Sequence, residues 1–427
     1  MKTIKVNYLA RVEGEGALRI RFRGDQVRDV ELRIFEPPRF FEAFLRGRHF
    51  AEAPDLTARI CGICPVAYQM SACAAVEDAL AIRVPDHISD LRRLIYCGEW
   101  IESHSLHMFM LHAPDFLGFD GALEMAKSHR DAVSRGLAIK RAGNELIRTL
   151  GGREVHPINV RVGGFYSLPA PAELRALIPN LTAARESARE ALEWMSHFEF
   201  PEFERDYEFV ALRGERNYPF IGNRLQSNKG LDIGANQYDE AFEERQVSHS
   251  NALQSVIKAR DHYVCGPLAR FNLNFDLLTK VASEAARGVG LAAPCRNPFR
   301  SILVRCIETI EALEQAITII ENYDGKGAAH VEAKARAGTG YGLSEAPRGT
   351  LYHRYRIDEA GLIDDANIVP PTSQNQPSIE DDLREIAPRM LTLDHAEATR
   401  LAERAVRNYD PCISCATHFL KLTMERE

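Results

Sequence analysis

The chain has 427 residues, of which 45% are hydrophobic and 26% charged, with a formal net charge of −7. This composition is typical of a globular protein and excludes collagen-like, fibrous and disordered chains. Scattered basic residues and a negative net charge argue against a nucleic-acid-binding surface. The apolar runs are too short and too polar for a membrane span of about 20 residues. The N-terminus lacks the apolar stretch of a signal peptide, so we expect a cytoplasmic protein.

The first 36 residues predict an antiparallel β-meander. Apolar and polar side chains alternate in three runs, and Gly24-Asp25 separates the last two. Two consecutive prolines end the pattern. We therefore interpret 1–36 as a meander that packs on the core.

Helical patterns dominate the rest of the chain. Pro65 suits the first position of a helix, and Gly151-Gly152 is a typical helix end. Long helices with few strands between them favour a central helical bundle. The predicted fold class is mainly α with small β additions (α+β), with helices near 65–80, 90–111, 122–150, 171–198 and 297–323.

Two stretches depart from the bundle pattern. Residues 203–250 are polar and contain a strand-like run, so we expect an excursion with a small sheet. Residues 325–375 are rich in Gly and Pro with little periodicity, which predicts a long loop. The predicted organisation is one integrated domain made of four parts: the meander, a first helical-core half at 37–202, the excursion, and a second half at 251–427.

Two Cys-x-x-Cys motifs lie near opposite ends of the chain. They are Arg59-Ile60-Cys61-Gly62-Ile63-Cys64-Pro65 and Asp410-Pro411-Cys412-Ile413-Ser414-Cys415-Ala416-Thr417-His418. This spacing brings two sulfurs within reach of one metal, and a helix start after Cys64 favours the thiolate. Four thiolates form a soft site suited to zinc, an iron–sulfur cluster or nickel. We expect the remaining cysteines to be buried free thiols: Cys73, Cys97, Cys265, Cys295 and Cys306.

A structural zinc is the simplest interpretation of paired Cys-x-x-Cys motifs. Such pairs usually lie within about 12–20 residues of each other. Here the motifs are separated by almost the whole chain, and each lies in an apolar helical context. A structural zinc site therefore fits this sequence poorly.

The motifs together resemble the large, catalytic subunit of [NiFe] hydrogenases, over essentially the whole chain. The cysteine motifs carry most of this resemblance. Weaker motifs follow in the family's order: Arg11-Val12-Glu13-Gly14, Ser103-His104, His112-Ala113-Pro114-Asp115, Gly151-Gly152 with His156-Pro157, and Glu345-Ala346-Pro347-Arg348-Gly349. The chain looks most like the soluble, NAD(P)-coupled branch, which includes sulfhydrogenase-type alpha subunits. A related complex I-like scaffold subunit has generally lost the nickel thiolates, all of which are present here.

The resemblance implies a nickel–iron centre. Cys61 and Cys412 would be terminal ligands of nickel, and Cys64 and Cys415 would bridge nickel to an iron that carries CO and two cyanides. A nearby site would hold magnesium or another divalent ion through Glu42, the backbone carbonyl of Ile368, and His418.

The resemblance also implies which residues transfer protons and which stabilise charge. Glu13 matches a glutamate that relays protons between Cys412 and the surface. Arg348 matches an arginine held over the metals, where its charge would act on the reacting centre. Asp115 and Asp410 would orient its guanidinium.

Further matches concern the surroundings of the centre. Thr372 would donate a hydrogen bond to a cyanide, and Pro347 belongs to the cofactor pocket. His104 and His156 match supporting residues, although an ordinary core histidine explains each equally well. Tyr68 stands where the family commonly has a histidine, and its hydroxyl could donate the same hydrogen bond with different geometry.

The implied activity is reversible oxidation of H2 to protons and electrons. No further clustered cysteines are present, so a small subunit must carry the Fe-S clusters, with diaphorase-type flavin subunits passing electrons to NAD(P). Coupling to F420 or a ferredoxin is one alternative, and a non-catalytic scaffold is another. The resemblance also implies that a maturation endopeptidase cuts after His418 and removes 419–427.

Overall fold

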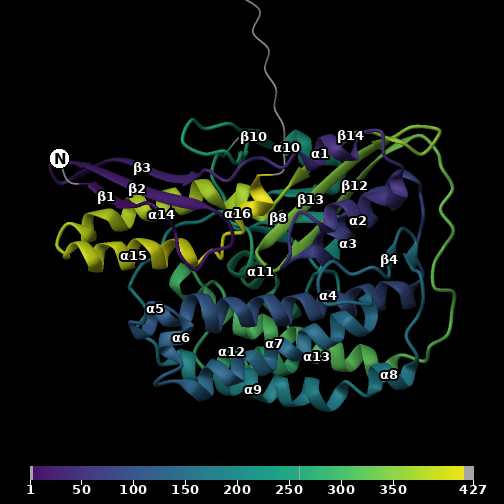
Figure 1. The fold of residues 1–427 in the computed structure, drawn as a ribbon, viewed down its shortest axis with the longest axis horizontal. Coiled ribbons are helices and arrows are strands. Elements are labelled where there is room, and N and C mark those ends of the chain that lie inside the picture. Colours follow the sequence, from purple (N-terminus) through teal and green to yellow (C-terminus); the bar gives the residue numbers. More distant parts are fainter. Residues whose placement is uncertain (1–2, 259, 418–427) are drawn as a thin grey trace, which may run out of the picture.

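The computed structural model describes residues 3–258 and 260–417 (Figure 1). Its lower part in that view is a layer of long helices: α4 (Asp86–Leu106), α7 (Arg130–Gly151), α9 (Ile178–Ser196) and α13 (Ser301–Asn322). Helix α4 packs against α7 and α13, and α13 also packs against α9. The predicted helical bundle is confirmed, although two predicted helices are each broken into two. Shorter helices flank the layer: α5 (Ala113–Leu117), α6 (Ala122–Met125), α8 (Pro171–Arg175), α11 (Pro267–Asn274) and α12 (Lys280–Gly288).

The predicted N-terminal meander is confirmed. Its strands are β1 (Thr3–Val6), β2 (Gly16–Arg23) and β3 (Gln26–Ile34), antiparallel in the order β1-β2-β3. The alternation seen in the sequence is the burial pattern, because Leu18, Ile20 and Phe22 are buried on one face. That face packs against α14 (Pro371–Met390) and α15 (His395–Arg407).

The expected loop at 325–375 is wrong for most of its length. The segment contains β12 (Gly338–Ala346), β13 (Gly349–Ile357) and β14 (Ile363–Val369), which form an antiparallel sheet with β7 (Ile221–Gly222) in the order β14-β13-β12-β7. Strand β12 lies directly on α3 (Pro65–Ala79). A Cβ at Gly340 would lie 2.0 Å from the Ala75 carbonyl oxygen. The glycines of β12 therefore indicate close packing of the strand against the helix and not a flexible loop.

The polar excursion contains the predicted small sheet. Strands β6 (Val210–Leu212), β8 (Arg224–Ser227) and β9 (Asp232–Gly234) pair antiparallel. After α10 (Tyr238–Ala241), β10 (Phe242–Arg245) pairs with β11 (Gln254–Ile257), so the excursion continues beyond residue 250. One hydrophobic cluster nevertheless extends from Ile4 to Cys415 and joins both helical halves.

The remaining elements bring the two cysteine motifs together. Helix α3 begins immediately after Cys64, and α16 (Ile413–Ala416) immediately after Cys412, and in Figure 1 both lie above the layer of long helices. The other short elements are α1 (Phe41–Leu45), α2 (Ala53–Ala58), β4 (Val160–Arg161), β5 (Gly164–Phe165), a π-helical turn (His107–His112), and 3₁₀ turns at Phe50–Glu52, Ala235–Gln237, Phe275–Leu277 and Pro298–Arg300.

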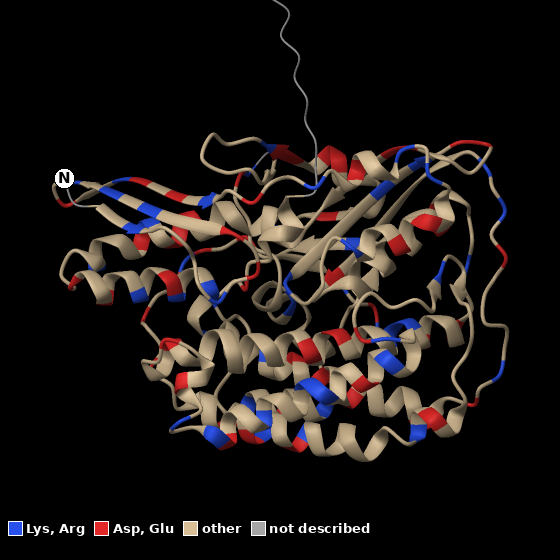
Figure 2. Cartoon of the chain, viewed as in Figure 1, with Lys and Arg blue, Asp and Glu red and all other residues tan. Residues whose placement is uncertain are grey.

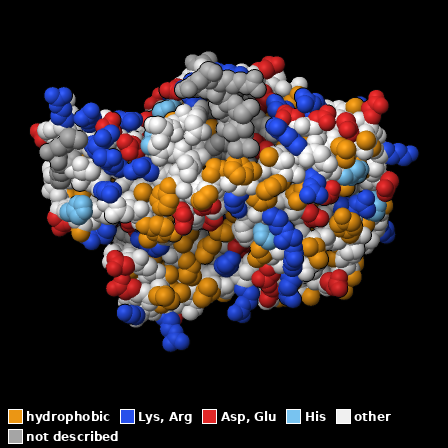
Figure 3. Space-filling view, turned by 45° about the horizontal axis from the view of Figure 1, so that its top comes forward, with side chains coloured by type: hydrophobic (Ala, Val, Ile, Leu, Met, Phe, Trp, Pro, Cys, Tyr) orange, Lys and Arg blue, Asp and Glu red, His pale blue; other side chains and the backbone are white. Residues whose placement is uncertain are grey.

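The surface carries charges of both signs. Lys and Arg are interspersed with Asp and Glu along most elements in Figure 2. Figure 3 shows hydrophobic side chains gathered across the middle of one face, between charged side chains of both signs. Among the described residues, no helix is both long and apolar enough to cross a membrane.

Candidate metal centre

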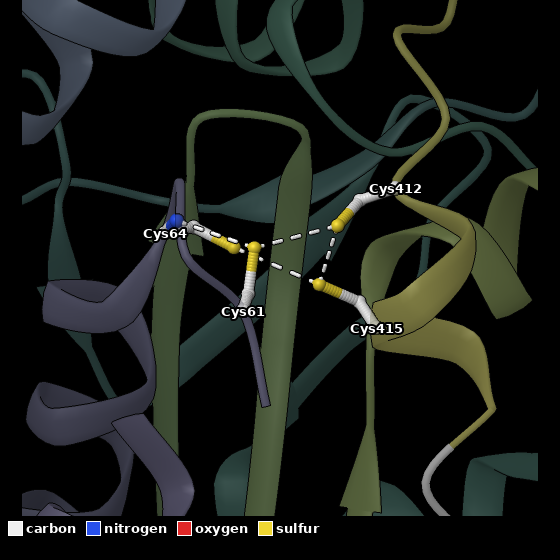
Figure 4. Close-up of side chains that lie close together, drawn as sticks. All are labelled: Cys61, Cys64, Cys412 and Cys415. Atoms are coloured by element: carbon white, nitrogen blue, oxygen red, sulfur yellow. Dashed lines mark hydrogen bonds between the residues drawn. The ribbon is translucent and has the colours of Figure 1, made fainter. Parts of the chain in front are cut away.

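Four cysteine side chains from the two ends of the chain point toward one another (Figure 4). The Sγ atoms of this thiol cluster (Cys61, Cys64, Cys412 and Cys415) all lie within 4.8 Å of one another. The sulfurs of Cys61 and Cys412 are 3.5 Å apart, and those of Cys64 and Cys415 3.7 Å. Two sulfurs bound to one metal at about 2.3 Å each lie at most about 4.6 Å apart. The cluster therefore has the dimensions of a four-thiolate metal site.

The ionisation of the thiols is strongly coupled. Hydrogen bonds from Cys412, Cys415 and Cys64 lower the pKa of the Cys61 thiol well below that of a free cysteine. Burial raises the pKa of Cys412, which is 1% exposed. The pocket thus favours one thiolate and disfavours four. A bound cation is what would allow all four sulfurs to ionise.

Glu13 lies beside Cys412 because the two chain segments form a parallel β-bridge. The Ile413 N–H donates to the Glu13 carbonyl oxygen at 2.9 Å. A side chain at Gly14, where φ is +88°, would collide with Ile413, so the bridge requires this glycine. The Cys412 Sγ and the Ser414 N–H donate to Glu13 Oε2 at 3.0 and 3.1 Å. Since Glu13 is partly exposed, its carboxylate links the buried thiol with solvent.

Arg348, in the turn between β12 and β13, is 3% exposed. Its Nε donates to the Asp410 carbonyl oxygen at 2.8 Å and its Nη2 to Asp410 Oδ1 at 3.2 Å. Its Nη1 has no hydrogen-bond partner among the residues that the structure describes. Burial alone would lower the pKa of Arg348, but Asp410 and the thiols of Cys412, Cys64 and Cys61 raise it well above its ordinary value. Arg348 therefore brings a fixed positive charge to the cluster.

Asp115 does not bond Arg348 in the structure, so the prediction that it orients the Arg348 guanidinium is wrong. Asp115 lies in the first turn of α5 and faces α15 and the N-terminal segment. It accepts hydrogen bonds from Arg11 Nη2 at 2.6 Å and from Arg407 Nε at 2.6 Å and Nη2 at 2.7 Å. Both carboxylate oxygens are thus occupied by other arginines.

Comparison with known proteins identifies the family. The sequence profile described as "Nickel-dependent hydrogenase" matches residues 39–138 and 262–418, which include both cysteine motifs. The chain belongs to the nickel-dependent hydrogenase family. Members of this family are oxidoreductases that act on H2, and this chain is a large subunit.

Two relatives and one solved structure illustrate the similarity of this hydrogenase subunit to others. It is 32% identical over 424 residues to sulfhydrogenase 1 subunit alpha of Pyrococcus furiosus, covering 98% of each chain. It is 28% identical to the NAD-reducing hydrogenase HoxS subunit beta of Cupriavidus necator, covering 98% of this chain and 95% of that one. A crystal structure of an NAD+-reducing [NiFe]-hydrogenase in the H2-reduced state superposes with a TM-score of 0.89 at 26% identity, covering 98% of this chain and all of the other.

Thr372 contacts the thiol cluster of this hydrogenase, and Pro347 lies in the turn that carries Arg348. The Cys412 N–H donates to Thr372 Oγ1 at 2.9 Å, which leaves the Thr372 hydroxyl proton available for another acceptor. Pro347 immediately precedes Arg348, and its carbonyl oxygen accepts a hydrogen bond from Arg270 at 2.9 Å.

Two of the three predicted magnesium ligands lie together. The Ile368 N–H donates to Glu42 Oε1 at 2.8 Å, which joins α1 to β14. Burial raises the pKa of Glu42 to about 7. His418 lies outside the described residues.

Tyr68 is buried on α3, one turn after Cys64. Its ring centroid lies 5.7 Å from that of His353 on β13. Burial raises the pKa of Tyr68 well above its ordinary value, and the nearby charges of Cys415 and Cys64 add to this rise. The phenol therefore stays protonated beside the hydrogenase thiols and is able to donate a hydrogen bond.

The two histidines weighed from the sequence have ordinary partners. His104 Nε2 lies 3.0 Å from Glu308 Oε2 within a fully buried network, as expected of a core histidine. His156 Nδ1 lies 2.8 Å from the Ala58 carbonyl oxygen, at the end of α2 and three residues before Cys61.

Sequence reasoning missed two residues that hold the cysteine motifs. Arg39 Nη2 donates to the carbonyl oxygen of Ile60, at 2.6 Å, and to that of Ser414, and so ties the two motifs together. Glu99 on α4 accepts the N–H groups of Val66 and Ala67 at 2.6 and 3.0 Å, at the start of α3. Neither residue belongs to a motif, and their partners are distant in sequence or on another helix.

Proposed function

We propose that the chain catalyses reversible oxidation of H2 to protons and electrons at a buried nickel–iron centre whose iron carries CO and cyanide. The observation that carries this proposal is that both cysteine motifs converge in the thiol cluster. The first cysteine of each motif lies against the first of the other, at 3.5 Å, and the second against the second, at 3.7 Å. The four thiols would hold the nickel and the iron of such a centre.

The residues around the cluster support a division of tasks. When bound, such a nickel–iron group supplies the site at which H2 is cleaved heterolytically. The Cys412 Sγ takes the proton, and Glu13 Oε2, 3.0 Å away, receives it and passes it toward solvent. Arg348 holds its charge beside the thiols without proton exchange, since a guanidinium stays protonated. The Thr372 hydroxyl would donate a hydrogen bond to a cyanide.

Glu42 and Ile368 support a divalent-cation site beside the centre. A buried carboxyl whose pKa is raised to about 7 is only partly ionised at neutral pH. A magnesium ion held by Glu42, the Ile368 carbonyl and His418 would keep it ionised, because a nearby cation favours the carboxylate.

Electrons leave through a partner subunit that carries Fe-S clusters. The first motif reaches the surface at Gly62, which is exposed and has open space beside it. His156 is bonded to α2 just before that motif, and its loop exposes Val155, Ile158 and Tyr166 by 50%, 54% and 56%. We call these residues (Gly62, Val155, His156, Ile158 and Tyr166) the exit patch. Exposed apolar side chains on a loop that is bonded to the segment before the first cysteine motif fit a docking surface.

The electron acceptor is NAD(P). Diaphorase-type flavin subunits pass the electrons to it from the Fe-S subunit. The similarity to the NAD+-reducing [NiFe]-hydrogenase structure and to the NAD-reducing relative supports this acceptor. F420 and ferredoxin are the competing acceptors.

Metal analysis, infrared spectroscopy and acceptor assays on the purified complex test the proposal. We expect nickel and iron in the protein, infrared bands of metal-bound CO and cyanide, and H2-dependent reduction of NAD+ or NADP+. A complex without nickel would make the chain a scaffold subunit. Reduction of F420 or ferredoxin alone would overturn the NAD(P) assignment and leave the hydrogenase assignment intact.

A further inference from the structure

A buried ion network lies behind the turn that carries Arg348. Arg270 on α11 is completely buried, and all its N–H groups are used. Its Nε and Nη2 donate to Glu308 at 2.8 and 2.7 Å, and its Nη1 donates to Glu345 at 3.0 Å. The remaining two N–H groups donate to the carbonyl oxygens of Ala346, at 2.8 Å, and Pro347, at 2.9 Å.

These two carbonyls belong to the residues immediately before Arg348. Glu345 holds the other side of the same turn, because its Oε1 accepts from the Leu212 N–H at 2.8 Å and the Thr350 hydroxyl at 2.9 Å. Arg270 thus fixes the backbone before Arg348, and Glu345 holds the Thr350 side chain after it. Charge-assisted hydrogen bonds with a planar guanidinium are strong and directional.

We propose that Arg270 is a positioning residue for Arg348: it fixes the turn from which the Arg348 guanidinium extends over the thiol cluster. Asp410 holds only one edge of that guanidinium, so its direction depends on the backbone that carries it. Fold stability alone does not account for the network, because apolar residues of similar volume often replace buried ion pairs without loss. The inference rests on the proposed role of Arg348 at the metal centre.

Lysine at position 270 keeps the charge but lacks the planar fork. Three ammonium protons cannot bond both Glu308 oxygens, Glu345 and both carbonyls at once. Arg270→Lys therefore loosens the turn and leaves the carboxylates compensated. Arg92→Lys is the matched control. Arg92 is also buried, and its Nη1 and Nη2 donate to the two carboxylate oxygens of Glu77 at 2.8 and 2.5 Å. Among the described residues, it bonds the carbonyl oxygen of Arg161 and makes no hydrogen bond with the Arg348 turn.

The experiment is a double-mutant cycle of Arg270→Lys and Arg348→Lys in the whole complex, with Arg92→Lys alongside. Nickel content, unfolding temperature, the CO stretching frequency and H2 turnover are measured for each variant. We expect Arg270→Lys to retain nickel, to shift the CO band in the same direction as Arg348→Lys, and to lower turnover about 10- to 100-fold. The double variant should lose no more turnover than Arg348→Lys alone. Arg92→Lys should lower the unfolding temperature and leave the band unshifted.

Losses that multiply in the double variant, or an unshifted CO band in Arg270→Lys, would overturn the inference. So would an equal band shift in Arg92→Lys. If Arg270→Lys fails to fold, Glu345→Gln is the second test variant. Glutamine has nearly the shape of glutamate but no charge, so it weakens the hydrogen bonds of Glu345 to Arg270 and Thr350. An unshifted band in that variant also counts against the inference. Absence of nickel or CO bands in the unmutated complex would instead overturn the proposed function.

Discussion

Cys412 is the residue on which most contacts of the site converge. Its sulfur lies against Glu13, Cys61 and Cys415, and its N–H bonds Thr372. We expect Cys412→Ser to abolish H2 turnover and to lower nickel content sharply, because a hydroxyl is a poor ligand for a soft metal. Metal analysis and turnover assays measure both effects.

Cys73→Ser is the control for this loss. Cys73 is equally buried, on α3, but outside the thiol cluster. This variant should retain nickel and turnover. Full activity of Cys412→Ser would contradict the nickel assignment, and equal losses in the two variants would point to a general effect of serine in the core.

Glu13 offers a separate test of proton transfer. Glu13→Gln preserves shape but cannot carry a proton, so H2 turnover and exchange of H2 with solvent deuterium should fall by about 100-fold or more, with metals retained. Conversion of para-H2 to ortho-H2, which needs no proton exit, should persist. Glu15→Gln, at an exposed glutamate two residues away, should change none of these rates. Unchanged solvent exchange in Glu13→Gln would place the proton path elsewhere.

Among the elements, β12 and α3 pack so closely that Gly340 has no room for a side chain. At Gly340 a Cβ would lie 2.0 Å from the Ala75 carbonyl oxygen and 2.3 Å from the Ala79 nitrogen, both backbone atoms. We expect Gly340→Ala to destabilise the fold by about 2–3 kcal/mol, because neither backbone can move aside. Thermal unfolding measures the change.

Gly222→Ala, in β7 of the same sheet, is the matched control. There the nearest atoms to a Cβ are Leu212 methyl groups at 3.7 Å, an ordinary contact distance. This variant should unfold near the unmutated temperature. A Gly340→Ala protein as stable as Gly222→Ala would show that the strand and helix can separate at little cost.

The helices and the meander could be predicted because their signals are local. Helix α3 begins at Pro65 as expected, and Leu18, Ile20 and Phe22 are buried as their alternation indicated. Strand β12 was missed because its glycines reflect contact with a helix more than 250 residues earlier in the chain. Such contacts leave no local pattern.

Helix α14 was missed for a similar reason. It contains two internal prolines and opens with a polar run, which in isolation is typical of a loop. Yet the polar side chains of that run are buried. Gln374 Nε2 donates to the Thr350 carbonyl oxygen, and the side-chain Oδ1 of Asn375 accepts the Cys265 N–H at 2.9 Å. Long-range partners satisfy a helix that composition alone disfavours.

For the site, too, local features could be predicted from the sequence and long-range contacts could not. The spacing of the cysteines predicted that each motif forms a pair, and the structure brings the pairs together. Asp115 was misassigned because the choice between Arg348 and Arg407 depends on how α5 faces α15. Arg39 and Glu99 act across the fold and carried no signal in the sequence.

At the scale of the whole molecule, the exit patch makes a prediction about assembly. Ile158→Glu places a charge among exposed apolar side chains, so it should weaken co-purification of the Fe-S subunit while nickel stays bound. Leu123→Glu, at a residue 91% exposed on α6, is the control and should leave the complex intact. Size-exclusion chromatography with metal analysis distinguishes the two. An intact complex in Ile158→Glu would move the docking surface elsewhere.

Maturation of the C-terminus gives another prediction at this scale. Thr417 and Cys415 are 0% and 1% exposed, so the last described residues are packed inside. The residues after His418 include charged side chains, whose burial is costly. We expect intact-mass spectrometry of H2-active protein to show a chain that ends at His418. Active protein that still ends at Glu427 would contradict this cleavage.

The distance between the two cysteine motifs along the sequence also affects the order in which the thiols are synthesised. Cys61 and Cys412 lie 351 residues apart, and a ribosome adds about 5–20 residues per second, so the first pair of thiols emerges about 18–70 s before the second. During that interval Cys61 and Cys64 form an open dithiol, which binds soft ions such as zinc or copper. A stray ion captured there would occupy the place of the intended metal. The nascent N-terminal half must therefore be kept free of metal until translation is nearly complete.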